Sequence, residues 1–291
     1  MIKDLFFALR PRQWVKNLLI FLPLIFGKRL FIFPDNLKTA IAFSIFSLAA
    51  SSVYLINDIL DLDRDRFHPA KRLRPLASGK IGVRQAFFTA LILSALSLAL
   101  SFILDAGFGR VVAAYLAFNI LYTALFKKAV IIDVFCIGVF FLLRVAAGSL
   151  IAGVSMSPWI IIMTALLALF LGFTKRRQEL KMTGIKAPRY RRVLIEYKPY
   201  FIDQMIGVTA SSIAVAYMLY TLDARTVGEL GTAHLMYSIP FVYYGIFRYL
   251  YLIHKIARDG DPTRVLFSDV KTQINLVFWV VTCILVIYFG L

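Results

Sequence analysis

Long apolar runs alternate with shorter polar segments along the whole chain. A helix needs about 20 apolar residues to cross a bilayer, and this pattern predicts nine such helices. We therefore expect an all-α polytopic membrane protein, folded as a single integral membrane domain over residues 1–291. The predicted spans cover roughly residues 15–33, 39–58, 86–104, 109–126, 130–152, 157–174, 201–222, 233–254 and 272–290.

The composition supports this interpretation. Hydrophobic residues make up 60% of the chain, whereas soluble proteins contain about 45–50%. The first predicted span is the least regular, because Pro23, Gly27, Lys28 and Arg29 interrupt its apolar run.

The basic residues indicate how the chain is oriented. The net charge is +17, but most of the 33 Lys and Arg residues lie between apolar runs. This placement points to topology, anionic lipid or an anionic substrate rather than to nucleic acid. Because basic loops stay inside, we expect a cytoplasmic N-terminus in the cytoplasmic (inner) membrane. Two long loops, at about 59–85 and 175–200, would face the cytoplasm.

The second run ends in an unusual polar stretch, "NDILDLDRDRFHPAKRLRPLASGK". Asp58, Asp61 and Asp65 have i, i+3, i+7 spacing, so they share one face if the helix continues to about Asp65. Such carboxylates repel one another unless a cation lies among them, and Asn57 adds a neutral oxygen. Hard oxygen ligands suit Mg²⁺. The alternative is a solvated helix end with internal ion pairs.

Basic residues follow these acids directly. Arg72 and Arg74 lie in the segment "KRLRP". A diphosphate bound by Mg²⁺ on one side needs cations on its other oxygens. The stretch therefore predicts a site for a phosphate-bearing substrate at the cytoplasmic edge of the membrane.

The same stretch resembles the first aspartate-rich motif of the UbiA-type intramembrane prenyltransferase superfamily. That resemblance implies a bundle of nine transmembrane helices around a central cavity, with Mg²⁺ at a cytoplasmic site. The positions that match the motif are Asn57, Asp58, Asp61, Asp65, Arg74, Pro75 and Gly79.

One departure from the superfamily pattern matters. A second aspartate-rich motif is expected after the sixth span, but the chain reads "FLGFTKRRQELKMTG" there, with Lys175, Arg176 and Arg177. A site with one acidic and one basic cluster suits two anionic substrates. Five segments resemble the decaprenyl-phosphate phosphoribosyltransferase branch of the superfamily: "LRPRQWVKNLLIFLPLIFG", "LYTALFKKAVIIDV", "FLLRVAAG", "GFTKRRQEL" and "RDGDPTRVLFSD".

This branch implies transfer of 5-phosphoribose from phosphoribosyl diphosphate to a polyprenyl phosphate, which supplies arabinofuranose donors for cell-wall polysaccharides. Which basic cluster binds the ribose 5-phosphate and which binds the lipid phosphate stays open. The implied roles are Mg²⁺ binding and catalysis for Asp58, Asp61 and Asp65 with Asn57; donor phosphate contacts for Arg72 and Arg74; lining of the site for Lys16, Tyr122 and Lys127; and binding of the metal-free anion for Lys175 and Arg176.

Arg144 lies in the middle of the fifth predicted span. A charge at that depth is costly, so we expect Arg144 to bind substrate in the cavity or to pair with an acid such as Asp133. The roles of Asp261 and Asp269 stay open.

Two other functions compete with this one. An ordinary UbiA-type enzyme would join a prenyl diphosphate to an aromatic acceptor, and the basic cluster at 175–177 argues against it. A transporter of anionic lipids would carry its acids near the bilayer midplane, not at the edge. Lipid chain length, final polymer and homo-oligomer formation are not determined by the sequence.

Overall fold

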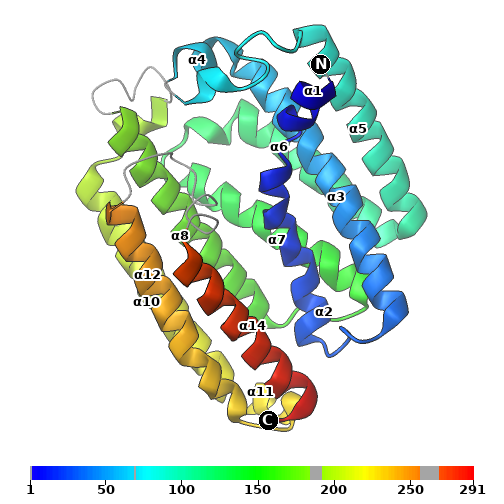
Figure 1. The fold of residues 1–291 in the computed structure, drawn as a ribbon, viewed down its shortest axis with the longest axis vertical. Helices are drawn as coiled ribbons and strands as arrows, with labels where there is room; N and C mark the ends of the chain where they lie inside the picture. The colour runs from blue at the N-terminus through cyan, green and yellow to red at the C-terminus, as the bar shows by residue number, and fades with distance from the viewer. Residues whose placement is uncertain (1, 69, 184–191, 256–268) are drawn as a thin grey trace. The chain divides into compact units, whose positions relative to one another are not determined.

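The computed structural model describes residues 2–68, 70–183, 192–255 and 269–291, and these contain helices and no strand (Figure 1). Six helices in this part of the chain are long and apolar enough to cross a membrane. They are α3 (Phe33–Leu60), α5 (Val83–Leu104), α7 (Ile132–Ala152), α8 (Pro158–Thr183), α10 (Pro199–Leu222) and α14 (Val270–Phe289).

The other three predicted spans are also helical, but they are not among these six helices. Helices α6 (Ala106–Ala124) and α12 (Ile239–Lys255) occupy two of them. The first predicted span is wrong as one continuous helix, because it divides into the 3-10 helix η1 (Pro11–Phe21) and the short α2 (Leu22–Phe26). Pro23 lies in the first turn of α2 and has no N–H to extend a regular ladder. The count of nine spans stays a prediction.

The chain divides into two compact units. Unit 1 comprises Met1–Met156 with Pro188–Val193, and unit 2 comprises Ser157–Ala187 with Leu194–Leu291. The predicted single domain stays a prediction.

Helix α3 is the centre of unit 1. It contacts η1, α5, α6 and α7 (Figure 1). Phe46 and Ala49 of α3 are fully buried with Ile20 of η1 and with Phe108 and Val112 of α6. Small residues on α3 let these neighbours approach closely, which is how membrane helices gain packing energy without a hydrophobic driving force. The short elements of this unit are α1 (Ile2–Ala8), α4 (Leu62–Phe67), η2 (Lys71–Leu73) and η3 (Phe126–Lys128).

Unit 2 is built on two helix pairs. Helix α8 packs along α10, and α12 packs against both α10 and α14. Tyr217 of α10 joins three elements, because its hydroxyl bonds to Ser238 Oγ at 2.6 Å and accepts from Trp279 Nε1 at 2.9 Å. The short elements are η5 (Arg192–Ile195), α11 (Ala224–Leu230) and η6 (His234–Ser238).

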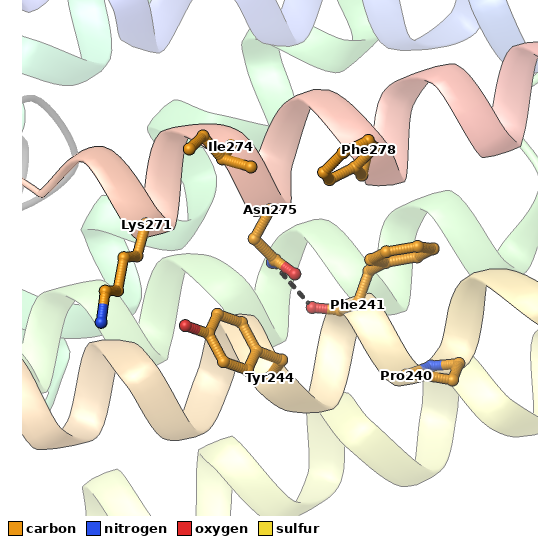
Figure 2. A pocket seen from close by; sticks show the side chains of 7 residues that line it. All are labelled: Pro240, Phe241, Tyr244, Lys271, Ile274, Asn275 and Phe278. Carbon is orange, nitrogen blue, oxygen red and sulfur yellow. Dashed lines mark hydrogen bonds between the residues drawn. The ribbon is translucent and has the colours of Figure 1, made fainter.

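A shallow apolar groove of about 410 Å³ lies between α12 and α14 (Figure 2). Asn275 Nδ2 donates to the Phe241 carbonyl at 2.9 Å and joins the two helices. No residue predicted to bind substrate lines this groove, so it is not the predicted site. Its lining residues are Pro240, Phe241, Tyr244, Lys271, Ile274, Asn275 and Phe278.

Two glycines of α7 give a matched test of unit 1 packing. A Cβ at Gly148 would overlap the backbone carbonyl of Ile20 in η1, whereas a Cβ at Gly138 would meet nothing within 4 Å. We expect Gly148→Ala to lower the free energy of unfolding by about 1–3 kcal/mol, the usual cost of overpacking. Gly138→Ala should leave it unchanged or slightly higher. Thermal unfolding in detergent checks this, and equal stability of the two variants would contradict the packing of η1 on α7.

Candidate active site

The acidic stretch begins where α3 ends. The predicted continuous helix to Asp65 is wrong, because α3 stops at Leu60, Asp61 adopts φ −99° and ψ 7°, and α4 starts at Leu62. The interruption is small. Asp61 N still donates to Asn57 O at 2.9 Å, and Asp65 N donates to Asp61 O at 2.8 Å.

Arg74 brings two of the three predicted aspartates together. Its Nη1 donates to Asp58 Oδ1 at 3.0 Å and also contacts Asp65 Oδ2. Both acids are deeply buried, with 3% of Asp58 and 4% of Asp65 exposed. Arg10, which precedes η1, also contacts Asp58 Oδ1. Burial raises the pKa of Asp65, and the Arg74 guanidinium opposes that rise.

A tight turn fixes the position of Arg74. Ser78 N donates to the Arg74 carbonyl at 2.9 Å, and Gly79 has φ 76°, a left-handed conformation that favours glycine. Leu76 and Ile81 on either side are buried beside Leu55 of α3. The small-residue and Gly part of the motif therefore serves to anchor the arginine.

The third aspartate has a different partner. Asp61 Oδ2 contacts Lys127 Nζ of η3, so Lys127 lies beside this aspartate. Its role in lining the substrate site stays a prediction. Asn57 Oδ1 accepts from Thr123 Oγ1 of α6 at 3.0 Å. The last turn of α6 thus approaches the end of α3, as needed for a shared site.

Two further predicted residues lie close to these groups along the chain. Tyr122, one residue before Thr123, packs its ring edge-on against Phe140 at 5.6 Å. Arg72 is exposed and makes no ion pair with any described residue. Its role in binding substrate stays a prediction.

Arg144 is enclosed inside unit 1, with 3% of its surface exposed. The alternative of an ion pair with Asp133 is not what the structure shows: Arg144 Nε donates to Asn17 Oδ1 at 2.7 Å and its Nη2 donates to Tyr115 Oη at 3.3 Å. A role for Arg144 in binding substrate stays a prediction. Lys16 precedes Asn17 on η1 and is partly buried.

The predicted basic cluster lies on α8 in unit 2. Lys175 is partly buried, and Arg176 is only 1% exposed and contacts Glu179 Oε2. Arg177 Nε donates to Asp203 Oδ1 of α10 at 2.7 Å. The amide oxygen of Gln178 is buried without a hydrogen-bond partner in the described chain.

Asp269 bonds to groups that hold unit 2 together. It caps α14 by accepting from Thr272 N at 2.9 Å, and it receives Arg248 Nη2 at 2.7 Å and Nε at 3.0 Å. The hydrogen bonds from Arg248 hold the pKa of Asp269 below its ordinary range. Asp261 lies outside the described residues.

The acidic cluster fits a divalent cation held by few protein ligands. Asp58 and Asp65 converge on a single guanidinium nitrogen, so two carboxylates already share one cationic position. Among the described residues, no three His, Cys, Asp or Glu side chains gather around one point. Mg²⁺ commonly uses one or two carboxylates and completes its shell with substrate phosphates and water. The fuller ligand set with Asn57 and Asp61 stays a prediction.

Sequence reasoning missed two residues of unit 1. Arg10 reaches Asp58 across 48 residues of chain, and Asn17 links η1 to α3 and α7. Both residues lie in the segment "LRPRQWVKN", for which the resemblance implies a role only for Lys16. Asn17 lies where this polar segment meets the first apolar run. A polar group at that position was the available signal, since such groups are costly in a membrane.

Comparison with known proteins defines the class. Residues 21–270 match the model of the UbiA prenyltransferase family, so the chain belongs to that family. Because six helices of its described residues are long and apolar enough to cross a membrane, it is a multi-pass membrane transferase.

Individual proteins similar to this chain are more specific than the family as a whole. The chain is 32% identical to decaprenyl-phosphate phosphoribosyltransferase of Corynebacterium glutamicum, over 97% of this chain and 86% of the relative. It is also 32% identical to the enzyme of the same name from Mycolicibacterium smegmatis, over 100% of this chain and 94% of the relative. A solved UbiA homologue from Archaeoglobus fulgidus bound to GPP and Mg²⁺ shares the fold, with TM-score 0.71 at 20% identity, covering 98% and 99% of the two chains.

The position of Asp269 gives a test within unit 2. Asn caps helices about as well as Asp, whereas Ala loses about 1 kcal/mol. We therefore expect thermal stability in detergent to fall from wild type to Asp269→Asn, which loses the ion pair, and further to Asp269→Ala, which also loses the cap.

The ion pair between Arg248 and Asp269 should make stability depend on pH and on salt. Because the folded-state pKa of Asp269 is depressed, its stabilising effect is present above the unfolded-state pKa and is lost as pH falls through the folded value. The gap between wild type and Asp269→Asn should also narrow in high salt. Wild-type stability in both variants would contradict the structural role.

Proposed function

We propose that the protein transfers 5-phosphoribose from phosphoribosyl diphosphate to a polyprenyl phosphate of the decaprenyl type and releases diphosphate. The observation that carries this proposal is the near full-length similarity to two enzymes named decaprenyl-phosphate phosphoribosyltransferase. The residues agree with it, because the chain combines an acidic cluster with several cations suited to two anionic substrates.

The acidic cluster is assigned to the donor. Asp58 and Asp65, with Asn57 and Asp61, would hold Mg²⁺, which supplies charge neutralisation for the leaving diphosphate. Arg74 lies between the two buried carboxylates and so can contact the same diphosphate from the protein side. Arg72, Lys16, Tyr122 and Lys127 are proposed to contact the donor or line its site.

The basic cluster on α8 is assigned to the anion without metal. Lys175 is partly accessible, whereas Arg176 is enclosed with Glu179. We propose that Lys175 contacts that anion and that Arg176 supports it from the buried side. This anion is either the lipid phosphate or the ribose 5-phosphate. Because both are phosphate groups, an experiment has to decide which of them the basic cluster binds.

The reaction needs little proton transfer. The bond from ribose C1 to the diphosphate oxygen breaks, and its electron pair leaves with the diphosphate. An oxygen of the lipid phosphate forms the new bond to C1 from the opposite face, with inversion. Cations fixed in advance stabilise the departing charge, and the acceptor is already anionic, so no strong general base is required.

The product would serve as a precursor of arabinofuranose donors for cell-wall polysaccharides. We propose that the site faces the cytoplasm, where a soluble diphosphate donor is available and where the basic loops are expected to lie.

The second candidate function is prenyl transfer from a prenyl diphosphate. It is favoured by the fold that the chain shares with a UbiA homologue bound to GPP.

The test uses purified protein in detergent with Mg²⁺, ribose-labelled phosphoribosyl diphosphate and a polyprenyl phosphate. We expect label to enter the organic phase and a chelator to abolish the transfer. Asp58→Asn should lower the rate by at least about 100-fold, since removal of one preorganised charge contact costs that much.

Asp63→Asn is the matched control. The Asp63 side chain is 94% exposed, and within the described part of the chain its ion-pair partner is the exposed Arg66 at 3.8 Å, so this variant should keep full activity. Melting temperatures of both variants separate lost chemistry from lost folding. If label stays in the aqueous phase while the protein consumes a prenyl diphosphate with an aromatic acceptor, the proposal fails and the second candidate replaces it.

A further inference from the structure

The broken first span raises the question of what holds it in place. Helix η1 has eleven residues, whereas 3-10 helices longer than 3–4 residues are uncommon because their hydrogen bonds are poor. Its position must therefore come from contacts with other helices. Three residues per turn place side chains at i and i+3 on one edge, which aligns Trp14, Asn17 and Ile20.

Each residue of this edge meets a neighbouring helix. Trp14 Nε1 donates to Ser51 Oγ at 3.0 Å, and Asn17 Nδ2 donates to Ser47 Oγ at 2.9 Å. Ser47 and Ser51 are one turn apart on α3. Ile20 is fully buried where its carbonyl lies against Gly148 of α7.

Arg144 closes this arrangement from α7. Its Nε donates to Asn17 Oδ1 at 2.7 Å, its Nη1 to the Phe140 carbonyl at 2.6 Å and its Nη2 to Tyr115 Oη at 3.3 Å. The rings of Phe46 and Tyr115 lie 5.3 and 5.0 Å from its guanidinium carbon. All three nitrogens have partners and two aromatic rings cover the group, so little of it remains for a substrate.

We infer that Arg144 is a positioning residue, which acts through Asn17 to fix η1 and with it the cations Arg10 and Lys16. Arg10 immediately precedes η1 and has φ 56°, an uncommon conformation for a residue with a side chain, and it contacts the catalytic candidate Asp58. Lys16 precedes Asn17 directly. A shift of η1 would move both cations relative to the acidic cluster.

The test measures the position of η1 and the reaction separately. In a Trp159→Phe, Trp279→Phe background, Trp14 is the single tryptophan among the three of the chain. We expect Arg144→Met and Asn17→Ala each to shift Trp14 emission to the red, as the indole loses its packing on α3.

The kinetic arm rests on the proposed function. Misplaced cations should raise KM for phosphoribosyl diphosphate by about 10–100-fold in both variants, with a smaller change in kcat. The double variant should be no worse than the poorer single variant, because both break one linkage. If wild type shows no phosphoribosyl transfer, the proposed function fails while the fluorescence arm still decides the positioning role.

Two matched variants complete the design. Asn17→Asp keeps the oxygen that accepts from Arg144, so it should retain Trp14 emission and KM. Arg110→Met removes an exposed arginine of α6 and should change neither. If Arg144→Met does not fold, the Asn17→Ala and Asn17→Asp pair carries the test. Unchanged Trp14 emission in Asn17→Ala, or lost turnover in Arg144→Met with emission unchanged, would overturn the inference.

Discussion

Two buried carboxylates that share one guanidinium are the constraint on which unit 1 depends. An ionised carboxylate removed from water is costly unless a cation and hydrogen bonds compensate it. Asp58 and Asp65 meet this requirement through Arg74, and Asp58 also contacts Arg10. The turn after Arg74, with Gly79 in a left-handed conformation and Leu76 buried, keeps the arginine at that position.

The same constraint also involves the first span, which is not a regular helix. Arg10 must reach Asp58 from the polar end of η1, while Ile20 packs against Gly148 at its apolar end. Polar side chains on one edge of η1 meet α3 and α7 between these two points. The fold thus gives up a regular backbone in this segment and gains contacts that place cations beside the acidic cluster.

Much of this architecture was predictable from the sequence. Apolar runs located the long helices, because backbone groups in a membrane must be satisfied within a helix. The spacing of Asp58, Asp61 and Asp65 located the acidic cluster, although Lys127 and Arg74 divide the three carboxylates between them. A charged residue that follows an apolar run is costly to place near a membrane, so the sequence pattern alone draws attention to it.

Other features depended on the tertiary structure. The side chains that bond to Arg144 come from η1 and α6, which are distant in sequence, so the alternative of a bond to Asp133 on its own helix does not hold. The break at η1 follows from contacts with α3 and α7, which no local propensity encodes. Arg10 was not assigned a role for the same reason, since its carboxylate partner lies 48 residues away.

The central claim is that both substrates carry phosphate and that ribose is the group transferred. The most direct measurement is mass spectrometry of the lipid extract after incubation of the protein with phosphoribosyl diphosphate, a polyprenyl phosphate and Mg²⁺. The account predicts a polyprenyl phosphate that has gained one phosphoribosyl group, with one diphosphate released for each lipid converted. Unmodified polyprenyl phosphate, alongside a prenylated acceptor when prenyl diphosphate is supplied instead, would contradict it.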